Sequence, residues 1–191
     1  MTTFAILGRC LASPPPPDWR ERLSGMLGAR PRRMGTWAEL GMYGALSCLA
    51  DARETSLAPD ALLMLGSRRG TCIPTRQALE QMRDDLPMPL TFLQTQPSQV
   101  LASLAAQMHW RGHAEFIAGG TPQALLHLAA AQCGRAGMLL GWVDETDGGS
   151  SRWLRLRPCA ESGGDLVASA EFAFSPDVTH IRLAGRGASA D

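Results

Sequence analysis

The sequence predicts a layered α/β domain with a mostly parallel five-stranded sheet, flanking helices and antiparallel edge strands near the C-terminus. Residues 61–66 and 138–143 are continuous apolar runs, as strands buried on both faces require. These runs alternate with segments of helical periodicity, and residues 113–131 read as a strand, a tight turn and a helix. Such alternation favours parallel strands that are joined by right-handed crossovers.

Composition limits the possible partners. The 191 residues, 45% of them hydrophobic, fit one domain, which we place at 1–184 and follow with a disordered tail at 185–191. Eighteen basic residues balance eighteen acidic ones, so no net charge draws the protein to nucleic acid or an anionic membrane. No apolar stretch approaches the ~20 residues that a membrane span needs. We therefore expect no nucleic-acid partner and no membrane span.

The cysteines indicate the compartment. There are five, an odd number, and they are widely spaced in apolar segments: Cys10, Cys48, Cys72, Cys133 and Cys159. This pattern is typical of reduced structural thiols rather than of a disulfide framework. The N-terminal segment also lacks the basic region of a signal peptide. We expect a cytoplasmic protein.

The N-terminal elements are a strand and two helices. Residues 4–7 predict a strand, and the four prolines at 14–17 form a stiff connector. Asp18 can cap a helix that follows it. A long helix is predicted at 36–52, and its small residues indicate close packing against a neighbour.

The middle of the chain continues the alternation. The buried strand at 61–66 leads into a loop at 67–71, which lacks the Gly-Lys-Ser/Thr ending of a phosphate loop. A helix is predicted at 74–84. Another begins with Pro97 at its first position and runs to Met108, because proline suits the first turn of a helix.

The pattern of apolar and polar residues changes beyond residue 144. Residues 153–157 alternate apolar and basic side chains, and 166–174 and 178–183 are further short candidate strands. We expect these three segments to form the antiparallel edge of the sheet. The acidic residues Asp144, Glu145 and Asp147 precede two glycines and read as a solvated turn.

A nucleophile elbow without a nucleophile is the most informative feature. The strand at 113–118 and the helix at 123–131 flank the turn Gly119-Gly120-Thr121-Pro122. A residue at the tip of such a turn lies at the positive end of a helix dipole, where a thiolate or an oxyanion is stabilised. Here that residue is Thr121, a weak nucleophile without an adjacent base.

Other candidate groups are weaker. His109 and His113 are four apart, but Arg111-Gly112 between them indicates a helix end, so we expect surface histidines and no metal site. His127 follows Thr121 by six residues, an awkward position for its base. Cys72 follows a Gly-Thr turn, and no paired histidine is evident in the sequence.

Taken in chain order, the segments between residues 14 and 145 resemble the N-terminal half of the β-ketoacyl synthases, which have the thiolase fold. The similarity rests on Arg32-Arg33-Met34 before the long helix, Leu65-Gly66-Ser67 after a strand, Trp110-Arg111-Gly112, and Asp144-Glu145. It implies one thiolase-like half. In that family the Arg-Gly pair precedes a strand at the dimer interface and then the active-site cysteine, whose position falls on Thr121.

The resemblance is strongest to short ketosynthase-like proteins and chain length factors of aryl polyene and xanthomonadin-type pigment clusters. It implies a noncatalytic subunit that pairs with an active β-ketoacyl synthase, meets acyl carrier protein through that partner, needs no cofactor, and helps to shape the acyl tunnel. Two sets of site residues follow. The implied tunnel gate comprises Gln96, Gln99, Val100 and Ser103, and the implied interface comprises His113, Glu115, Phe116 and Ile117.

Two alternatives stay open. One is a homodimeric scaffold that binds acyl carrier protein. The other is an acyltransferase or hydrolase that uses Thr121 or Cys72. Fold alone does not choose among these functions.

Overall fold

The computed structural model describes residues 2–86, 88–160, 165–166 and 172–183. The predicted tail at 185–191 lies outside the described residues. The elements, in chain order, are β1 (Thr2–Ala12), α1 (Trp19–Leu27), α2 (Thr36–Asp51), β2 (Leu62–Ser67), α3 (Cys72–Arg83), α4 (Pro89–Gln94), α5 (Ser98–Gln107), β3 (His113–Ala118), α6 (Pro122–Gln132), β4 (Met138–Asp144), β5 (Ser150–Cys159), β6 (Asp165–Leu166), a 3-10 helix (Phe172–Phe174) and β7 (His180–Leu183). No helix among the described residues is long and apolar enough to cross a membrane.

The sheet confirms the predicted α/β class and differs from the prediction in detail. Its strand order is β3-β2-β4-β5-β1-β7-β6, so the described residues form seven strands rather than five. β3, β2 and β4 are parallel neighbours, and β5 is antiparallel to both β4 and β1. Strands β1 to β4 therefore all run in one direction. β7 lies antiparallel to β1.

The predicted antiparallel edge is wrong for β5, which lies inside the sheet between β4 and β1. The reason is Arg155, whose side chain is only 3% exposed and bonds Glu54 through Nε–Oε2 at 2.6 Å. The same guanidinium donates to the carbonyl groups of Ala136 and Leu156. An alternating basic residue therefore marks a buried ion pair here rather than a solvated edge. The predicted strand at 166–174 is wrong at 172–174, which form the 3-10 helix, and its residues 167–171 lie outside the described residues.

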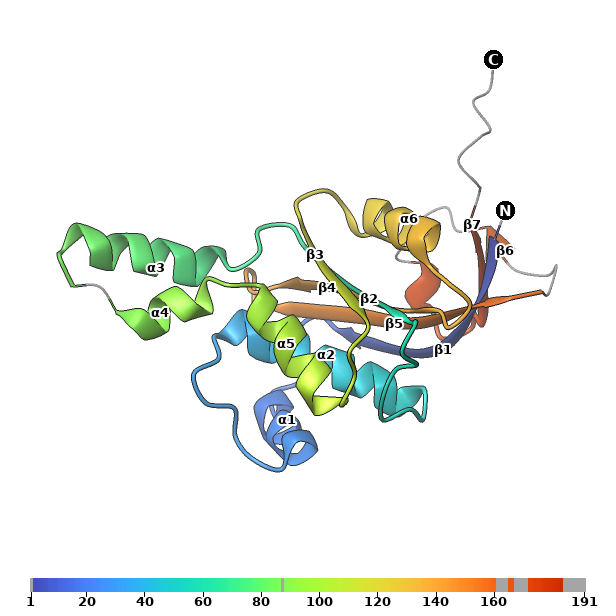
Figure 1. Ribbon diagram of the computed structural model, residues 1–191, viewed down its shortest axis with the longest axis horizontal. Coiled ribbons are helices and arrows are strands. Elements are labelled where there is room, and N and C mark those ends of the chain that lie inside the picture. The colour runs from blue at the N-terminus through green and yellow to red at the C-terminus, as the bar shows by residue number, and fades with distance from the viewer. Residues whose placement is uncertain (1, 87, 161–164, 167–171, 184–191) are drawn as a thin grey trace, which may run out of the picture.

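Helices cover both faces of the sheet, so the molecule has three layers (Figure 1). α1, α2 and α5 pack on one face around Trp37, Trp153 and Leu104. α6 packs on the other face around Leu126 and Trp142. Alternate residues of β2 and β4 enter the two cores, which accounts for the continuous apolar runs in those strands.

Helix α2 approaches the sheet closely through glycine, as its small residues predict. A Cβ atom on Gly44 would lie 2.1 Å from Ser151 Oγ and 2.4 Å from Trp153 Cδ1. Ser151 Oγ donates to the carbonyl of Leu40 at 2.7 Å and accepts from Trp153 Nε1 at 3.0 Å. The absence of a side chain at Gly44 lets the indole of Trp153 lie close beneath the helix.

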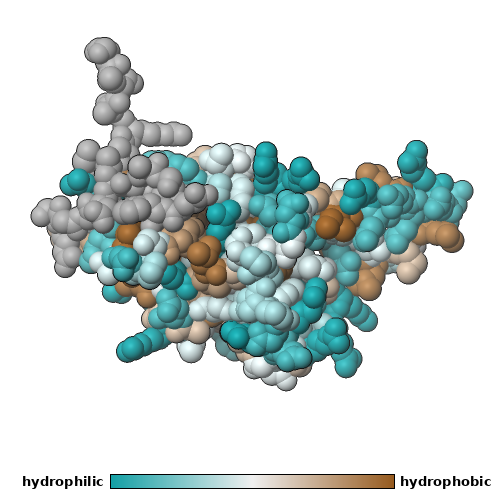
Figure 2. Space-filling view, turned by 180° about the vertical axis from the view of Figure 1, so that it is seen from behind, coloured by the Kyte–Doolittle hydropathy of each residue, from teal (hydrophilic) through white to brown (hydrophobic). Residues whose placement is uncertain are grey.

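Helices α3 and α4 form an arm that projects from the body (Figure 1). Seven large apolar side chains on this arm are exposed: Leu79, Met82, Leu86, Met88, Leu90, Phe92 and Leu93. In the space-filling view, brown patches lie on the part of the surface that the arm forms (Figure 2). Exposed apolar side chains gathered on one projecting element are common at protein–protein interfaces.

The contact between Gly44 and Trp153 predicts the effect of a single methyl group. We expect Gly44→Ala to destabilise the fold by about 1–3 kcal/mol, because both Ser151 and Trp153 are fully buried and have little room to move. The free energy of unfolding in urea measures the effect.

Gly25 provides the matched control within a helix. A Cβ atom there meets nothing within 4 Å. Gly25→Ala should stabilise the protein by roughly 0.5–1 kcal/mol through helix propensity. If both substitutions stabilise the protein equally, the proposed close packing at Gly44 is wrong.

Candidate functional site

The elbow is present, and its tip serves as a helix cap. Gly119 and Gly120 have φ values of 81° and 72°, the left-handed conformation that favours glycine. Thr121 is extended, and its Oγ1 accepts a hydrogen bond from the amide of Ala124 at 3.2 Å. Pro122 follows at the first helical position. The residue at the nucleophile position is thus an N-cap of ordinary geometry.

The described residues provide no base for the Thr121 hydroxyl. The nearest candidate in sequence, His127, lies within hydrogen-bond distance of Gln123, with 2.9 Å between the two Nε2 atoms. His113 pairs with Glu115, with 2.7 Å between Nε2 and Oε1. Neither histidine makes a hydrogen bond to Thr121, so the arrangement of a nucleophile and its base is not assembled around this residue.

The cysteines are free thiols, and burial suppresses the ionisation of three of them. Burial raises the pKa of Cys10 and of Cys133 to about 11, and that of Cys48 well above its usual value. Cys72 is the first residue of α3 and is half-buried. The described residues include no hydrogen bond between Cys72 and a histidine. No group of three or more metal-ligating residues occurs among them either.

The interpretation of the acidic residues as a solvated turn is wrong for Asp144 and Glu145, which are half-buried, whereas Asp147 is exposed in the turn after β4. Asp144 Oδ1 accepts from Ser67 Oγ at 3.0 Å and from the amide of Arg68 at 3.1 Å. Its Oδ2 accepts from Trp142 Nε1 at 2.8 Å. The carboxylate therefore holds the loop after β2 against the end of β4. No sequence signal marks this pairing, because the partners are more than seventy positions apart.

Glu145 anchors the next part of the same loop. Its Oε1 accepts from the amide of Ile73 at 3.0 Å, in the first turn of α3. Burial raises the pKa of Glu145, and backbone hydrogen bonds from Ile73 and Trp37 partly oppose that rise. A carboxylate at a helix N-terminus interacts favourably with the helix dipole. Asp144 and Glu145 together fix the base of the α3–α4 arm.

The predicted interface residues lie on β3, which is the edge strand of the sheet. Phe116 packs edge-on against Trp37, with ring centroids 5.6 Å apart. Ile117 packs against the core on the other face of the sheet. Both side chains therefore contribute to this chain's own core. His113 and Glu115 stand closer to solvent, paired with each other.

The main chain of β3 presents unused hydrogen-bonding groups along this edge. The amide of Gly119 donates to the carbonyl of Ser67 on β2. Because successive residues of a strand alternate in direction, the amides of His113, Glu115 and Ile117 also face β2, and those of Ala114, Phe116 and Ala118 face outward. An edge of this kind is a template for pairing with another strand.

The predicted gate residues do not share one environment. Val100 is fully buried, and its Cγ2 lies 2.9 Å from where a Cβ on Gly41 would be. It is part of the core between α5 and α2. Gln99 is half-buried and donates to the carbonyl of Arg33 at 3.4 Å, whereas Gln96 is exposed. Ser103 is half-buried on α5.

Comparison with known proteins gives a result at the level of structure alone. No protein-family model matches the sequence, and no curated protein is similar to it. Solved structures do match. The first, described as the ishigamide ketosynthase/chain length factor, has a TM-score of 0.56 at 18% identity and aligns over 74% of this chain.

Two further structures agree. A ketosynthase (ApeO) in complex with its chain length factor (ApeC) from Xenorhabdus doucetiae has a TM-score of 0.53 at 17% identity, over 86% of this chain and 82% of that one. A type II polyketide synthase complex, in which the acyl carrier protein AntF is bound to its ketosynthase AntDE, has a TM-score of 0.58 at 10% identity, over 83% of this chain.

This chain spans 48% of the ishigamide protein's matched chain and 63% of the matched chain in the AntDE complex. Identities of this size establish the fold and not the activity. The likeness agrees with the sheet, the elbow and the order of the elements described above. The chain has the thiolase-like fold of ketosynthases and chain length factors.

Proposed function

We propose that this protein is a noncatalytic subunit of the chain length factor type, which pairs with an active β-ketoacyl synthase and helps to shape its acyl tunnel. The observation that carries the proposal is a ketosynthase-like fold with an open edge strand and an elbow whose tip is a capping threonine. The pathway we propose is of the fatty-acid or polyketide type, in aryl polyene biosynthesis in the cytoplasm. Acyl carrier protein would be met through the partner.

The pairing part of the proposal rests on β3. The outward amides and carbonyls of Ala114, Phe116 and Ala118 need a partner or water, and a second strand beside them would continue the sheet. Structures of a ketosynthase bound to its chain length factor are among those that share this fold. We therefore assign the edge of β3 to the ketosynthase interface.

The arm supports the same assignment. Gly70, at its base, lies near the ring of Phe116: a Cβ atom added to Gly70 would lie 3.5 Å from Phe116 Cζ. Thr71 Oγ1 donates to the carbonyl of Thr95 at 2.7 Å and ties the two ends of the arm together. The arm thus begins beside β3, and its exposed apolar side chains, such as Phe92 at 60% exposure, offer a partner a second surface. A partner that covers both would remove this surface from water.

The gate part of the proposal needs revision for one residue. Val100 fills the space beside Gly41, so shortening it would disturb the core of this chain before it altered any tunnel. Gln96, Gln99 and Ser103 remain candidates, because they lie at or near the accessible side of α5. The amide nitrogens of Gln96 and Gln99 donate within the chain, to Thr95 Oγ1 at 3.1 Å and to the carbonyl of Arg33, so their amide oxygens are the groups left for a partner or for water in the tunnel.

A single proline tests the pairing at the edge. We expect Ala114→Pro to abolish co-elution with the ketosynthase, because proline removes an outward amide from β3. The fold itself should survive, since that amide has no role in the β2–β3 ladder and Ala114 is exposed. Size-exclusion chromatography of the co-expressed pair and the melting temperature of the variant measure the two effects.

Ala114→Val is the matched control, because valine keeps the amide and favours a strand. It should leave co-elution unchanged. Co-elution that survives Ala114→Pro would place the interface elsewhere. Formation of a stable homodimer that excludes the ketosynthase would favour the scaffold alternative. Phe116 is unsuitable for this test because it packs on Trp37.

A second test separates a capping threonine from a nucleophile. Thr121→Ala should reduce stability by about 1 kcal/mol, and Thr121→Asn should reduce it much less, because asparagine is itself a good cap. Neither change should alter product formation by the complex. Loss of activity in both variants, or an acyl adduct on Thr121 or Cys72 in the intact mass after incubation with an acyl thioester, would refute the noncatalytic assignment.

A third test concerns chain length. Ser103→Phe should shorten the acyl products of the complex and Ser103→Ala should lengthen them, while the two subunits remain associated. Ser98→Phe is the control on the same helix, because Ser98 is exposed and lies about 140° around the helix from Ser103. Mass spectrometry of the products decides the result. Equal product distributions in all three variants would contradict the proposal that α5 forms part of the tunnel gate.

A further inference from the structure

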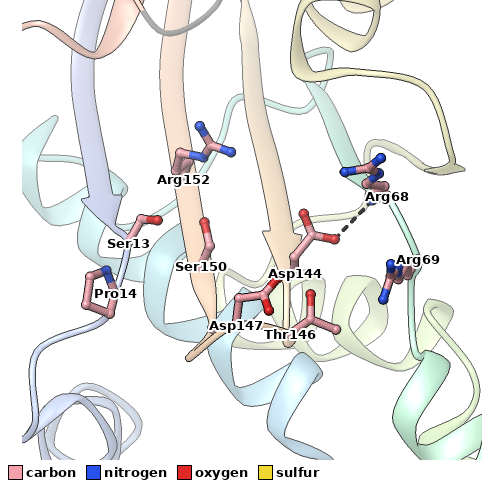
Figure 3. A pocket seen from close by; sticks show the side chains of 10 residues that line it. Ser13, Pro14, Arg68, Arg69, Asp144, Thr146, Asp147, Ser150 and Arg152 are labelled. Carbon is pink, nitrogen blue, oxygen red and sulfur yellow. Dashed lines mark hydrogen bonds between the residues drawn. The ribbon is translucent and has the colours of Figure 1, made fainter.

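A polar pocket of about 290 Å³ lies at one end of the sheet, apart from β3 (Figure 3). It is formed where β1, β2 and β4 end and β5 begins. Its lining residues are Ser13, Pro14, Arg68, Arg69, Asp144, Thr146, Asp147, Gly149, Ser150 and Arg152. In open α/β sheets, ligands bind preferentially outside the carboxyl ends of the strands.

Arginines stand on two sides of the pocket. Arg68 and Arg69 follow β2 on one side, and Arg152 projects from β5 on the other (Figure 3). The side chains of Arg68 and Arg69 are exposed and form no hydrogen bond or ion pair with any residue that the structure describes. Two arginines on one loop, neither paired with a carboxylate, are a favourable arrangement for an oxyanion.

Two carboxylates, Asp144 and Asp147, line the pocket beside three arginines, so the lining keeps one formal positive charge in excess. Asp144 lies between the two sides, and its oxygens already accept three hydrogen bonds from Ser67, Arg68 and Trp142. These bonds fix the main chain from which Arg68 and Arg69 project. Asp147 is exposed on the β4–β5 turn, where it opposes an anion through charge repulsion.

A buried hydroxyl also lacks a partner here. Ser150 Oγ is shielded from solvent and forms no hydrogen bond with any described residue. In Figure 3 it points along β5 toward Arg152. A buried polar atom left unsatisfied destabilises a fold, and such atoms are rare in native proteins. Ser150 also lines the pocket, so a small movement of this side chain would let its hydroxyl donate to a bound oxyanion.

We propose that this pocket binds a phosphate monoester, with Arg68 and Arg69 as the principal contacts. Guanidinium groups recognise phosphate through paired N–H donors, and phosphate carries more charge than a single carboxylate. The volume is at the lower limit of small-molecule sites, enough for the phosphoryl group and a short attached chain. The inference does not depend on the proposed ketosynthase pairing, because no residue of β3 or of the arm lines the pocket.

Calorimetric titration of the isolated chain at low ionic strength tests the proposal. Glycerol 3-phosphate and 4′-phosphopantetheine are the phosphate esters, and glycerol and pantetheine are their matched controls without phosphate. We expect saturable binding of at least one ester and of neither control. A preference for glycerol 3-phosphate indicates a small metabolite, and a preference for phosphopantetheine indicates a phosphate monoester with a longer, pantetheine-like chain.

Three variants connect the binding to the pocket. Arg69→Gln should weaken it roughly tenfold or more, since charged hydrogen bonds are lost. Asp147→Asn should tighten it about two- to fivefold by removing a repelling charge, and asparagine tolerates the positive φ of 54° at this position. Arg111→Gln removes the same charge at a residue that precedes β3 and does not line the pocket, so it should have no effect on binding.

Two results would overturn the proposal. One is the absence of saturable binding of both esters. The other is equal weakening by Arg69→Gln and Arg111→Gln, which would mean that net charge rather than the pocket attracts the anion.

Discussion

The close approach of α2 to the sheet organises the rest of the structure. Gly44 admits the indole of Trp153, and Gly41, one turn earlier, admits Val100 of α5. Trp37 at the start of the same helix donates to the carbonyl of Val143 at 3.0 Å and receives the ring of Phe116. One helix thereby locates β5, α5, β4 and the edge strand β3. A displacement of α2 would alter the proposed interface and the proposed gate together.

The elements and their order were predictable because each one depends on a pattern of residues that are close together in the sequence. The apolar runs of β2 and β4 and the turn at Gly119-Gly120 are read from neighbouring residues, and the structure agrees with them. The position of β5 was not predictable. Its alternating arginines suggest a solvated edge, but Arg155 is neutralised by Glu54, 101 positions away. Alternation in the sequence shows that one face of a strand carries charged residues. Whether that face is exposed to solvent or buried with an ion-pair partner depends on the tertiary structure.

The same limit applies to the candidate site. Helical spacing places Gln96, Gln99, Val100 and Ser103 near one another, yet it gives no information on which side of the helix meets the core. That choice depends on Gly41, which is 59 positions before Val100 and provides the space that the valine fills. The spacing of the residues predicts which of them share a face of α5. Packing of α5 against α2 determines which of those residues remain available to a partner.

The elbow retains its shape without its nucleophile because the shape also has a structural role. The amide of Gly119 extends the β2–β3 ladder by donating to Ser67, whose hydroxyl in turn donates to Asp144. Thr121 then starts α6, which covers the face of the sheet opposite α2. Loss of a cysteine at the tip would remove the chemistry and leave these contacts intact. In the proposed pairing, where the edge of β3 and the arm meet the partner, the strand, turn and helix keep a use without a nucleophile, since they hold that edge in place.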